Sequence, residues 1–152
     1  MERIPYNKAP KGLYDTMYEM GNYLEESGLD PQLIKLIDLR VSQINGCAFC
    51  LDMHYKEARY AGESELRLSL ILTWRETDIF SEKERAVLAY SEALTELNHA
   101  VDDKVYDELT RHFSNDEIAC LTMAVVRINS WNRYMLAFKI TPGRYEVAKE
   151  AA

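Results

Sequence analysis

Residues 30–62 read DPQLIKLIDLRVSQINGCAFCLDMHYKEARYAG, and this stretch predicts two consecutive helices that meet at a glycine. Asp30 followed by Pro31 is typical of a helix start, because aspartate can cap the first free N–H groups and proline fits the first helical position. A broad apolar face follows at helical spacing, made of Leu33, Ile34, Ile37, Leu39, Val41 and Ile44. Gly46 then ends this helix, because glycine readily takes the left-handed conformation found at helix ends.

The rest of the chain also carries helix signals, and no apolar alternation bounded by hairpin turns points to strands. A serine with a glutamate three residues later, a capping box that satisfies the first N–H groups of a helix, occurs at Ser81 and at Ser114. Besides the helix before Gly46, the expected helices span residues 13–26, 47–60 and 64–74, with one from Ser81 that has apolar positions as far as Leu97, one capped by Asp102, and one from Ser114 to about Lys139. The sequence therefore predicts an all-α fold of about six to seven helices.

Length and composition favour one soluble globular domain over residues 1–152. A chain of this length with 47% hydrophobic residues can bury one substantial core, and no linker-like stretch divides it. The formal net charge of −7, from 18 Lys and Arg against 25 Asp and Glu, excludes nucleic acid and membrane surfaces as first-choice partners. The opening residues, MERIPYNKAPKG, lack the apolar stretch of a signal peptide, so a cytoplasmic location is expected.

The motif that carries chemistry is CAFCLDMH at residues 47–54. At about 100° per residue on a helix, Cys47, Cys50 and His54 share one stripe. The first turn of a helix presents unpaired N–H groups and a positive dipole end, which favour a thiolate over a thiol. Cysteines one turn apart can also form a disulfide. The pattern indicates a redox-active cysteine pair with a histidine, one turn beyond Cys50, that can accept or donate a proton.

Two other interpretations of this motif stay open. The same three side chains are suitable zinc ligands, so a zinc-binding interaction module is one alternative. A closed zinc site needs a fourth ligand, and the remaining candidates, Cys120, His99 and His112, are not paired at ligand spacing. A purely structural pair of buried thiols is the other alternative. Cys120 lies in an apolar run and is expected to be a core residue, and neither of those two histidines is assigned a function.

The segment from Leu33 to Ala61, LIKLIDLRVSQINGCAFCLDMHYKEARYA, resembles the alkylhydroperoxidase D-like branch of the carboxymuconolactone decarboxylase superfamily. It has the Cys-x-x-Cys-x-x-x-His signature of that branch, preceded by a SQINGC run. Three later segments are also similar to the branch: WRE from Trp74, FSEKERAVLAYSEALTEL from Phe80 and INSWNRYMLAFK from Ile128. The resemblance extends over about residues 30 to 140 and is most specific around the cysteines.

The resemblance implies an all-helical domain that assembles as a homo-oligomer (dimer, trimer or hexamer) and works without a cofactor or a metal. In that family the second cysteine of the motif attacks a hydroperoxide, a role that falls to Cys50. The first cysteine, here Cys47, resolves the resulting sulfenic acid, and His54 matches the histidine of the proton relay. The implied reductant is an external dithiol of the lipoyl or thioredoxin-like kind.

Two arguments differ on which of the two thiols attacks the hydroperoxide. The helix dipole alone favours Cys47 as the more acidic thiol, because it lies nearer the helix start. The family precedent favours Cys50, and we follow it because Cys50 is one turn from His54.

One position departs from the family pattern. Peroxidases of this family carry a glutamate twelve residues before the first cysteine, as part of the relay that activates the thiol, and this chain has Lys35 there. Asp38, one turn later, is one replacement for the glutamate, and direct stabilisation of a thiolate by the Lys35 cation is another. Alternatively, Lys35 and Asp38 form a solvent-facing ion pair of little energetic worth.

The sequence thus predicts a thiol-dependent peroxidase that reduces hydroperoxides through Cys50, Cys47 and His54. A thiol-disulfide oxidoreductase or a redox sensor on the same site is the alternative within the fold. The namesake decarboxylases of the superfamily, which do not need the cysteine pair, are a further kind of enzyme, and retention of both cysteines argues against that use.

Overall fold

The computed structural model describes residues 2–96 and 99–147, and every regular element in these ranges is helical. The α-helices are α1 (Asp15–Glu26), α2 (Pro31–Asn45), α3 (Ala48–Tyr60), α4 (Glu65–Leu70), α5 (Glu82–Thr95), α6 (Asp103–Thr110) and α7 (Asn115–Phe138), with two short 3₁₀ helices, η1 (Tyr6–Lys8) and η2 (Ile71–Glu76). The predicted all-α fold of seven helices is confirmed for the described part of the chain. Leu97, the last apolar position expected on the helix after Ser81, lies outside it. None of these helices combines the length and the apolar character needed to cross a membrane.

Local signals define the helix ends as expected. The Asp30 carboxylate accepts a hydrogen bond from the N–H of Gln32 at 2.9 Å, and Gly46 ends α2 in the left-handed conformation, with φ of 66°. Both predicted capping boxes form, at the starts of α5 and α7. Each of these interactions joins residues at most four positions apart, so the boundaries follow from short stretches of sequence.

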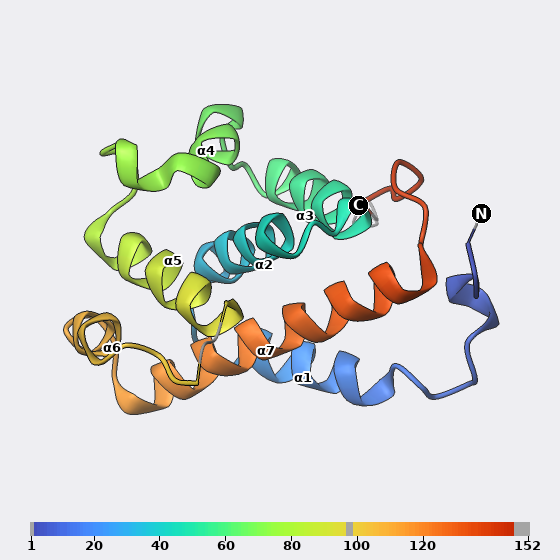
Figure 1. Ribbon diagram of the computed structural model, residues 1–152, viewed down its shortest axis with the longest axis horizontal. Helices are drawn as coiled ribbons and strands as arrows, with labels where there is room; N and C mark the ends of the chain where they lie inside the picture. The colour runs from blue at the N-terminus through green and yellow to red at the C-terminus, as the bar shows by residue number, and fades with distance from the viewer. Residues whose placement is uncertain (1, 97–98, 148–152) are drawn as a thin grey trace.

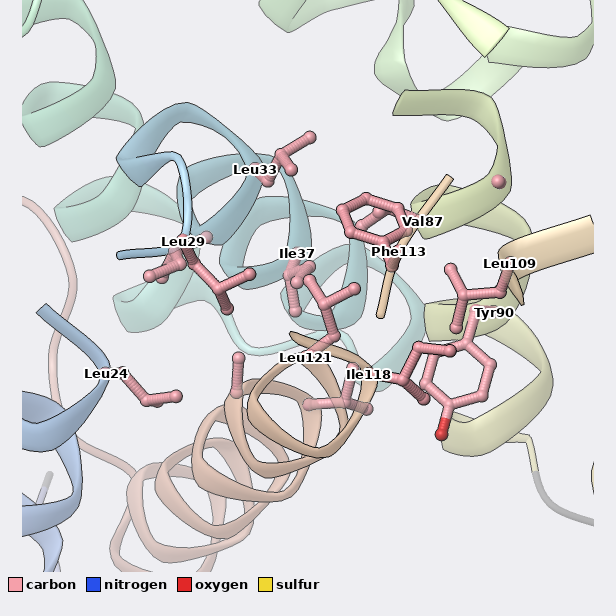
Figure 2. Close-up of a cluster of buried hydrophobic side chains, with 14 of the residues drawn as sticks. Leu24, Leu29, Leu33, Ile37, Val87, Tyr90, Leu109, Phe113, Ile118 and Leu121 are labelled. Atoms are coloured by element: carbon pink, nitrogen blue, oxygen red, sulfur yellow. The ribbon is translucent and has the colours of Figure 1, made fainter. Parts of the chain in front are cut away.

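α2 is the central helix of the fold (Figure 1). It packs against α3, α5 and α7, and α7 runs along the length of the molecule in this view. A large apolar cluster joins α2 to α1, α5, α6 and α7. Figure 2 labels ten of its members: Leu24, Leu29, Leu33, Ile37, Val87, Tyr90, Leu109, Phe113, Ile118 and Leu121. Ile37 and Leu121 are fully buried, and removing such side chains from water holds the helices together.

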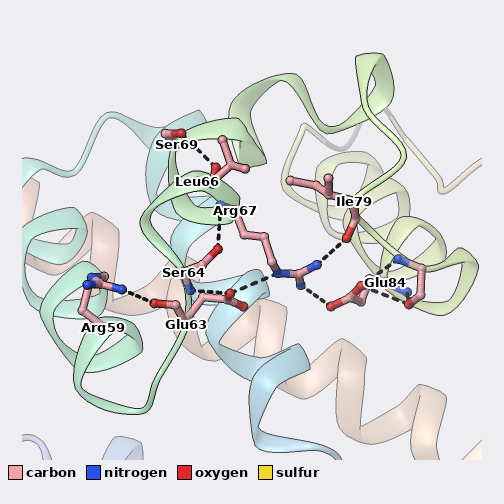
Figure 3. A network of polar contacts seen from close by, with 9 residues as sticks. Arg59, Glu63, Ser64, Leu66, Arg67, Ser69, Ile79 and Glu84 are labelled. Atoms are coloured by element: carbon pink, nitrogen blue, oxygen red, sulfur yellow. Dashed lines mark hydrogen bonds and ion pairs between the residues drawn. The ribbon is translucent and has the colours of Figure 1, made fainter.

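A second apolar cluster includes residues of α4 and η2. Figure 3 shows a polar network around Arg67 of α4. The Arg67 guanidinium donates to the carbonyl oxygen of Ile79 at 2.5 Å. It also pairs with Glu63 at 3.0 Å and with Glu84, the glutamate of the capping box that starts α5. One guanidinium therefore ties α4 to the start of α5.

The single helix expected from Ser64 to Trp74 is wrong. α4 is only six residues long, and η2 follows it with Thr73 outside helical backbone angles, at φ −117° and ψ 31°. The guanidinium of Arg85 donates to the carbonyl oxygens of Trp74 and Thr77 at 3.0 and 2.8 Å. These tertiary contacts hold the end of η2 and the residue that follows it against α5.

Glu92 of α5 is a buried carboxylate at the centre of an ionic cluster. It accepts hydrogen bonds from the indole N–H of Trp74 at 2.9 Å, from Arg75 at 2.5 Å and from Arg40 at 2.6 Å. Burial by itself raises the pKa of a carboxyl group, but these three hydrogen bonds outweigh it and hold the pKa of Glu92 below its ordinary value. Folding therefore favours the ionised form of Glu92.

Glu92→Gln is expected to lower the free energy of unfolding at pH 7 by about 2–4 kcal/mol, because it removes the charge that two arginines pair with. A carboxylate with a lowered folded-state pKa contributes stability above the unfolded pKa of about 4.3, and the contribution is lost as the pH falls through the folded value. The difference between the two proteins should therefore shrink at low pH in urea titrations followed by circular dichroism. A difference that stays constant down to acid pH would contradict the ionic role.

Candidate active site

The start of α3 holds both cysteines of the motif. Cys47 is the residue before the helix, in extended conformation, and Cys50 lies in the first turn. Their sulfur atoms are bonded to each other, with the Cα atoms 5.3 Å apart, so the structure has the disulfide form of the pair. Both residues are 1% exposed. The sequence argument that these cysteines can bridge is therefore consistent with the structure.

Side chains from α7 and from the N-terminal segment pack around the disulfide. Met135 is the buried neighbour, and the partly buried neighbours are Tyr6, Phe49, Trp131, Tyr134 and Ile140. This packing leaves little of either cysteine exposed.

A buried amide cluster holds α7 against the end of α2, just before the cysteines. The Asn45 side chain donates to Asn129 and Asn132 at 3.0 and 2.9 Å, and Asn132 donates to Ser42 at 3.0 Å. Asn132 is fully buried. Ser42 and Asn45 come from the SQINGC run and the two other residues from the INSWN segment, so these distant motifs meet to position the start of α3.

A cavity of about 660 Å³ opens beside the disulfide, between α1, α2, α3, α7 and the segment after α7. Most of its lining is apolar, including Met17, Phe49, Met53, Trp131 and Met135. It also has ionisable groups, among them Lys35, Asp38, His54, Glu57, Arg127 and Tyr145. Cys50 lines this cavity together with His54, whereas Cys47 is not among the lining residues. Of the two cysteines, Cys50 therefore lines the cavity that holds His54, whereas Cys47 lines a separate, smaller cavity of about 140 Å³.

Two carboxylates face Nδ1 of His54. Glu57, one turn later in α3, places Oε2 at 3.1 Å from Nδ1, and Asp38 of α2 places Oδ2 at 3.7 Å. An ionised carboxylate can only accept a hydrogen bond, so the proton of a neutral imidazole resides on Nδ1. Nε2 is then left unprotonated, which is the state that a proton acceptor requires.

Asp38 is 4% exposed and forms an ion pair with Arg127 of α7. Nη2 of Arg127 lies 2.8 and 3.0 Å from the two carboxylate oxygens. The solvent-facing ion pair between Lys35 and Asp38, which the sequence left open, is therefore wrong. The physical reason is that α7 packs over this face of α2 and removes Asp38 from water.

Glu57 and Tyr145 are residues of the cavity that the sequence interpretation missed. The Tyr145 hydroxyl donates to Oε1 of Glu57 at 2.6 Å. Burial raises the pKa of Glu57, but the hydrogen bonds from the histidine and the tyrosine, with the nearby charge of Lys35, lower it overall. Burial and the bond to the carboxylate raise the pKa of Tyr145, which stays protonated. The three-residue spacing from His54 was a signal for Glu57, and no local signal pointed to Tyr145.

Other candidate ligands do not gather at this site. Within residues 2–96 and 99–147, no group of three or more His, Cys, Asp and Glu side chains is arranged to hold a metal ion. Cys120 is a free thiol that packs, partly buried, against the cluster of Figure 2.

Known proteins similar to this chain share both the family and the fold. The model of the Carboxymuconolactone decarboxylase family matches residues 11–93. The uncharacterized protein YdfG of Bacillus subtilis (strain 168) is 38% identical over 138 residues, which cover 90% of this chain and 93% of that protein. The crystal structure of an Agrobacterium tumefaciens protein of unknown function, described as a candidate antioxidant defence protein AhpD, is 40% identical with a TM-score of 0.90, over 95% of this chain and 100% of that chain.

A more distant structure shows how widely the fold occurs. The debrominase Bmp8 has a TM-score of 0.78 at 19% identity, over 87% of this chain and 72% of that chain. This likeness concerns the fold alone. The family match and the near relatives go further, and by them the chain belongs to the carboxymuconolactone decarboxylase family, in its alkylhydroperoxidase D-like branch.

Proposed function

We propose that this protein is a thiol-dependent peroxidase that reduces hydroperoxides with Cys50, Cys47 and His54. The observation that carries the proposal is the arrangement of the disulfide. Cys50 and His54 line one largely apolar cavity. Cys47 does not line this cavity but forms a disulfide with Cys50. A cavity of this kind suits an organic molecule brought to one sulfur, with a second sulfur within bonding reach.

The first step oxidises Cys50. His54 accepts the thiol proton, and the thiolate attacks the terminal oxygen of the hydroperoxide. The O–O bond breaks as the S–O bond forms, which leaves a sulfenic acid on Cys50 and an alkoxide. The protonated His54 returns its proton to the alkoxide, so that an alcohol leaves the cavity.

The second step forms the disulfide that the structure contains. The Cys47 thiolate attacks the sulfur of the sulfenic acid, and hydroxide leaves and takes up a proton to become water. The cavity lining, which includes Cys50 and not Cys47, supports Cys50 as the attacking residue. The positive end of the helix dipole favours the thiolate form of both residues, because both lie within one turn of the helix start.

An external dithiol must complete the cycle. It attacks the disulfide, becomes a disulfide itself and returns both cysteines as thiols. Because Cys47 and Cys50 are each 1% exposed, a slender dithiol that enters the cavity reaches the disulfide at Cys50 more easily than the surface of a folded protein does. This burial favours a lipoyl-type reductant over a thioredoxin-like one.

Thiol counting tests the proposal directly. The fully reduced protein has three thiols, and one equivalent of cumene hydroperoxide is expected to leave one, that of Cys120, by titration with a chromogenic disulfide. A Cys120→Ser variant should fall from two thiols to none. Loss of a single thiol in that variant would show that Cys47 and Cys50 do not form a redox pair.

The zinc-binding alternative makes a different prediction for the same samples. Zinc binding needs free thiolates, and the bonded sulfurs in the structure favour the redox function. Elemental analysis of protein purified without chelators should find no stoichiometric zinc. Stoichiometric zinc, released when the thiols are oxidised, would support the alternative.

A further inference from the structure

We propose that Glu57 is a positioning residue that sets the tautomer of His54, and that Tyr145, on the segment after α7, holds the Glu57 carboxylate for this task. This inference rests on the peroxidase function proposed above. It assigns a role to two residues outside the Cys-x-x-Cys-x-x-x-His motif.

Glu57 is better placed than Asp38 to receive the Nδ1 proton of His54. The distance of 3.1 Å from Nδ1 to Glu57 is that of a hydrogen bond, whereas the 3.7 Å to Asp38 is too long for one. Both oxygens of Asp38 also already accept from Arg127. Asp38 therefore contributes its charge near the imidazole, and Glu57 determines which nitrogen carries the proton.

Tyr145 fixes the orientation of the Glu57 carboxylate. One oxygen, Oε1, accepts from the Tyr145 hydroxyl at 2.6 Å, and the other, Oε2, faces His54. With one partner for each oxygen, the carboxylate has little freedom to turn away from the imidazole.

The segment that carries Tyr145 is itself attached to α3. The N–H of Gly143 donates to Asp52 at 2.8 Å, and the Lys56 ammonium group donates to the carbonyl oxygen of Tyr145 at 2.9 Å. In Figure 1 this segment leaves the end of α7 and turns back toward α3. The last described part of the chain thus completes the polar side of the cavity.

The consequence for chemistry follows from hydrogen-bond roles. A glutamine at position 57 can donate its amide N–H to Nδ1, which a carboxylate cannot do. The proton of a neutral His54 would then sit on Nε2, where it prevents this nitrogen from accepting the Cys50 proton. Glu57→Gln keeps the size of the side chain, removes its negative charge and allows an amide N–H to face Nδ1.

Nitrogen NMR of the imidazole gives the first test. The wild-type protein, reduced or oxidised, is expected to show His54 as the Nδ1–H tautomer when neutral. Glu57→Gln should shift the population toward the Nε2–H tautomer, and Tyr145→Phe should shift it less. The other charged groups on the cavity lining, which all variants keep, are Glu25 of α1, Lys35 and Asp38 of α2, and Arg127 of α7. An unchanged tautomer in Glu57→Gln would overturn the proposal.

The rate of Cys50 alkylation gives the second test. In reduced Cys120→Ser protein, the pH dependence of iodoacetamide labelling is read on the Cys50 peptide by mass spectrometry. Glu57→Gln is expected to slow both labelling at neutral pH and hydroperoxide reduction by about 10- to 100-fold. Tyr145→Phe should have a smaller effect in the same direction.

Two exposed residues provide matched controls. Tyr60 is 58% exposed, and the Glu65 side chain is 72% exposed. Tyr60→Phe and Glu65→Gln should leave the tautomer and the labelling profile unchanged. Slowing by either control to the same extent would overturn the positioning role. If the wild-type protein does not reduce hydroperoxides, the proposed function fails, while the NMR test still decides the role of Glu57.

Discussion

Cys50→Ser is expected to reduce dithiol-supported hydroperoxide consumption by about 10⁴-fold or more, to the background rate of the dithiol alone. A serine hydroxyl is barely ionised at neutral pH, and its oxygen cannot accept an oxygen atom as sulfur does. Neither Cys47 nor Cys120 lines the cavity that holds His54, so no other thiol can replace Cys50 there. The measurement is peroxide loss followed with ferrous–xylenol orange.

Cys47→Ser separates the two steps of the cycle. It should keep one rapid stoichiometric reduction of peroxide, with a sulfenic acid trapped on Cys50 by dimedone, and should lose efficient turnover with a dithiol. Cys120→Ser should behave like the parent protein, because Cys120 packs against the distant apolar cluster of Figure 2. Full activity in Cys50→Ser would end the proposed mechanism.

Asp38→Ala is expected to lower the free energy of unfolding by about 3–5 kcal/mol, the largest stability effect that we predict. The reason is that Arg127 would keep its charge in a mostly buried place without the carboxylate that now accepts both of its hydrogen bonds. Urea denaturation at pH 7, followed by circular dichroism, measures the loss.

A double variant tests whether the loss comes from the unpaired charge. Asp38→Leu combined with Arg127→Leu removes both charges and should recover most of the stability lost in Asp38→Ala. Glu65→Ala breaks an exposed ion pair with Arg59 and should cost less than about 1 kcal/mol. If the double variant is no more stable than Asp38→Ala, the pairing of Asp38 and Arg127 does not explain the effect.

The family and the motif were accessible from the sequence, because both depend on neighbouring residues. The Cys-x-x-Cys-x-x-x-His spacing predicted the disulfide and the histidine one helical turn away. It could not predict which cysteine lines the cavity that holds His54, since that depends on how α1, α2 and α7 pack around α3. The thiol order was therefore open from dipole reasoning, and the cavity lining supports Cys50.

The charged residues near His54 show the same division between features that neighbouring residues predict and features that helix packing decides. Lys35 was recognised as a departure, but its consequences depend on groups from other elements. Asp38 turned out to be buried because α7 brings Arg127 to it, from 89 positions away in the sequence. The three-residue spacing from His54 was a local signal for Glu57, whereas its partner Tyr145 lies 88 positions further on.

The amino-acid sequence alone determined most of the helix boundaries, the all-α class and the placement of two thiols and an imidazole on one helix. Caps, left-handed glycines and apolar spacing depend on residues about four positions apart, so they do not require contacts between helices. Only the tertiary structure decided the continuity of the segment around Trp74, the burial of Asp38 and the partners of His54. Those features depend on contacts between helices, where burial and hydrogen bonding from remote residues outweigh local preference.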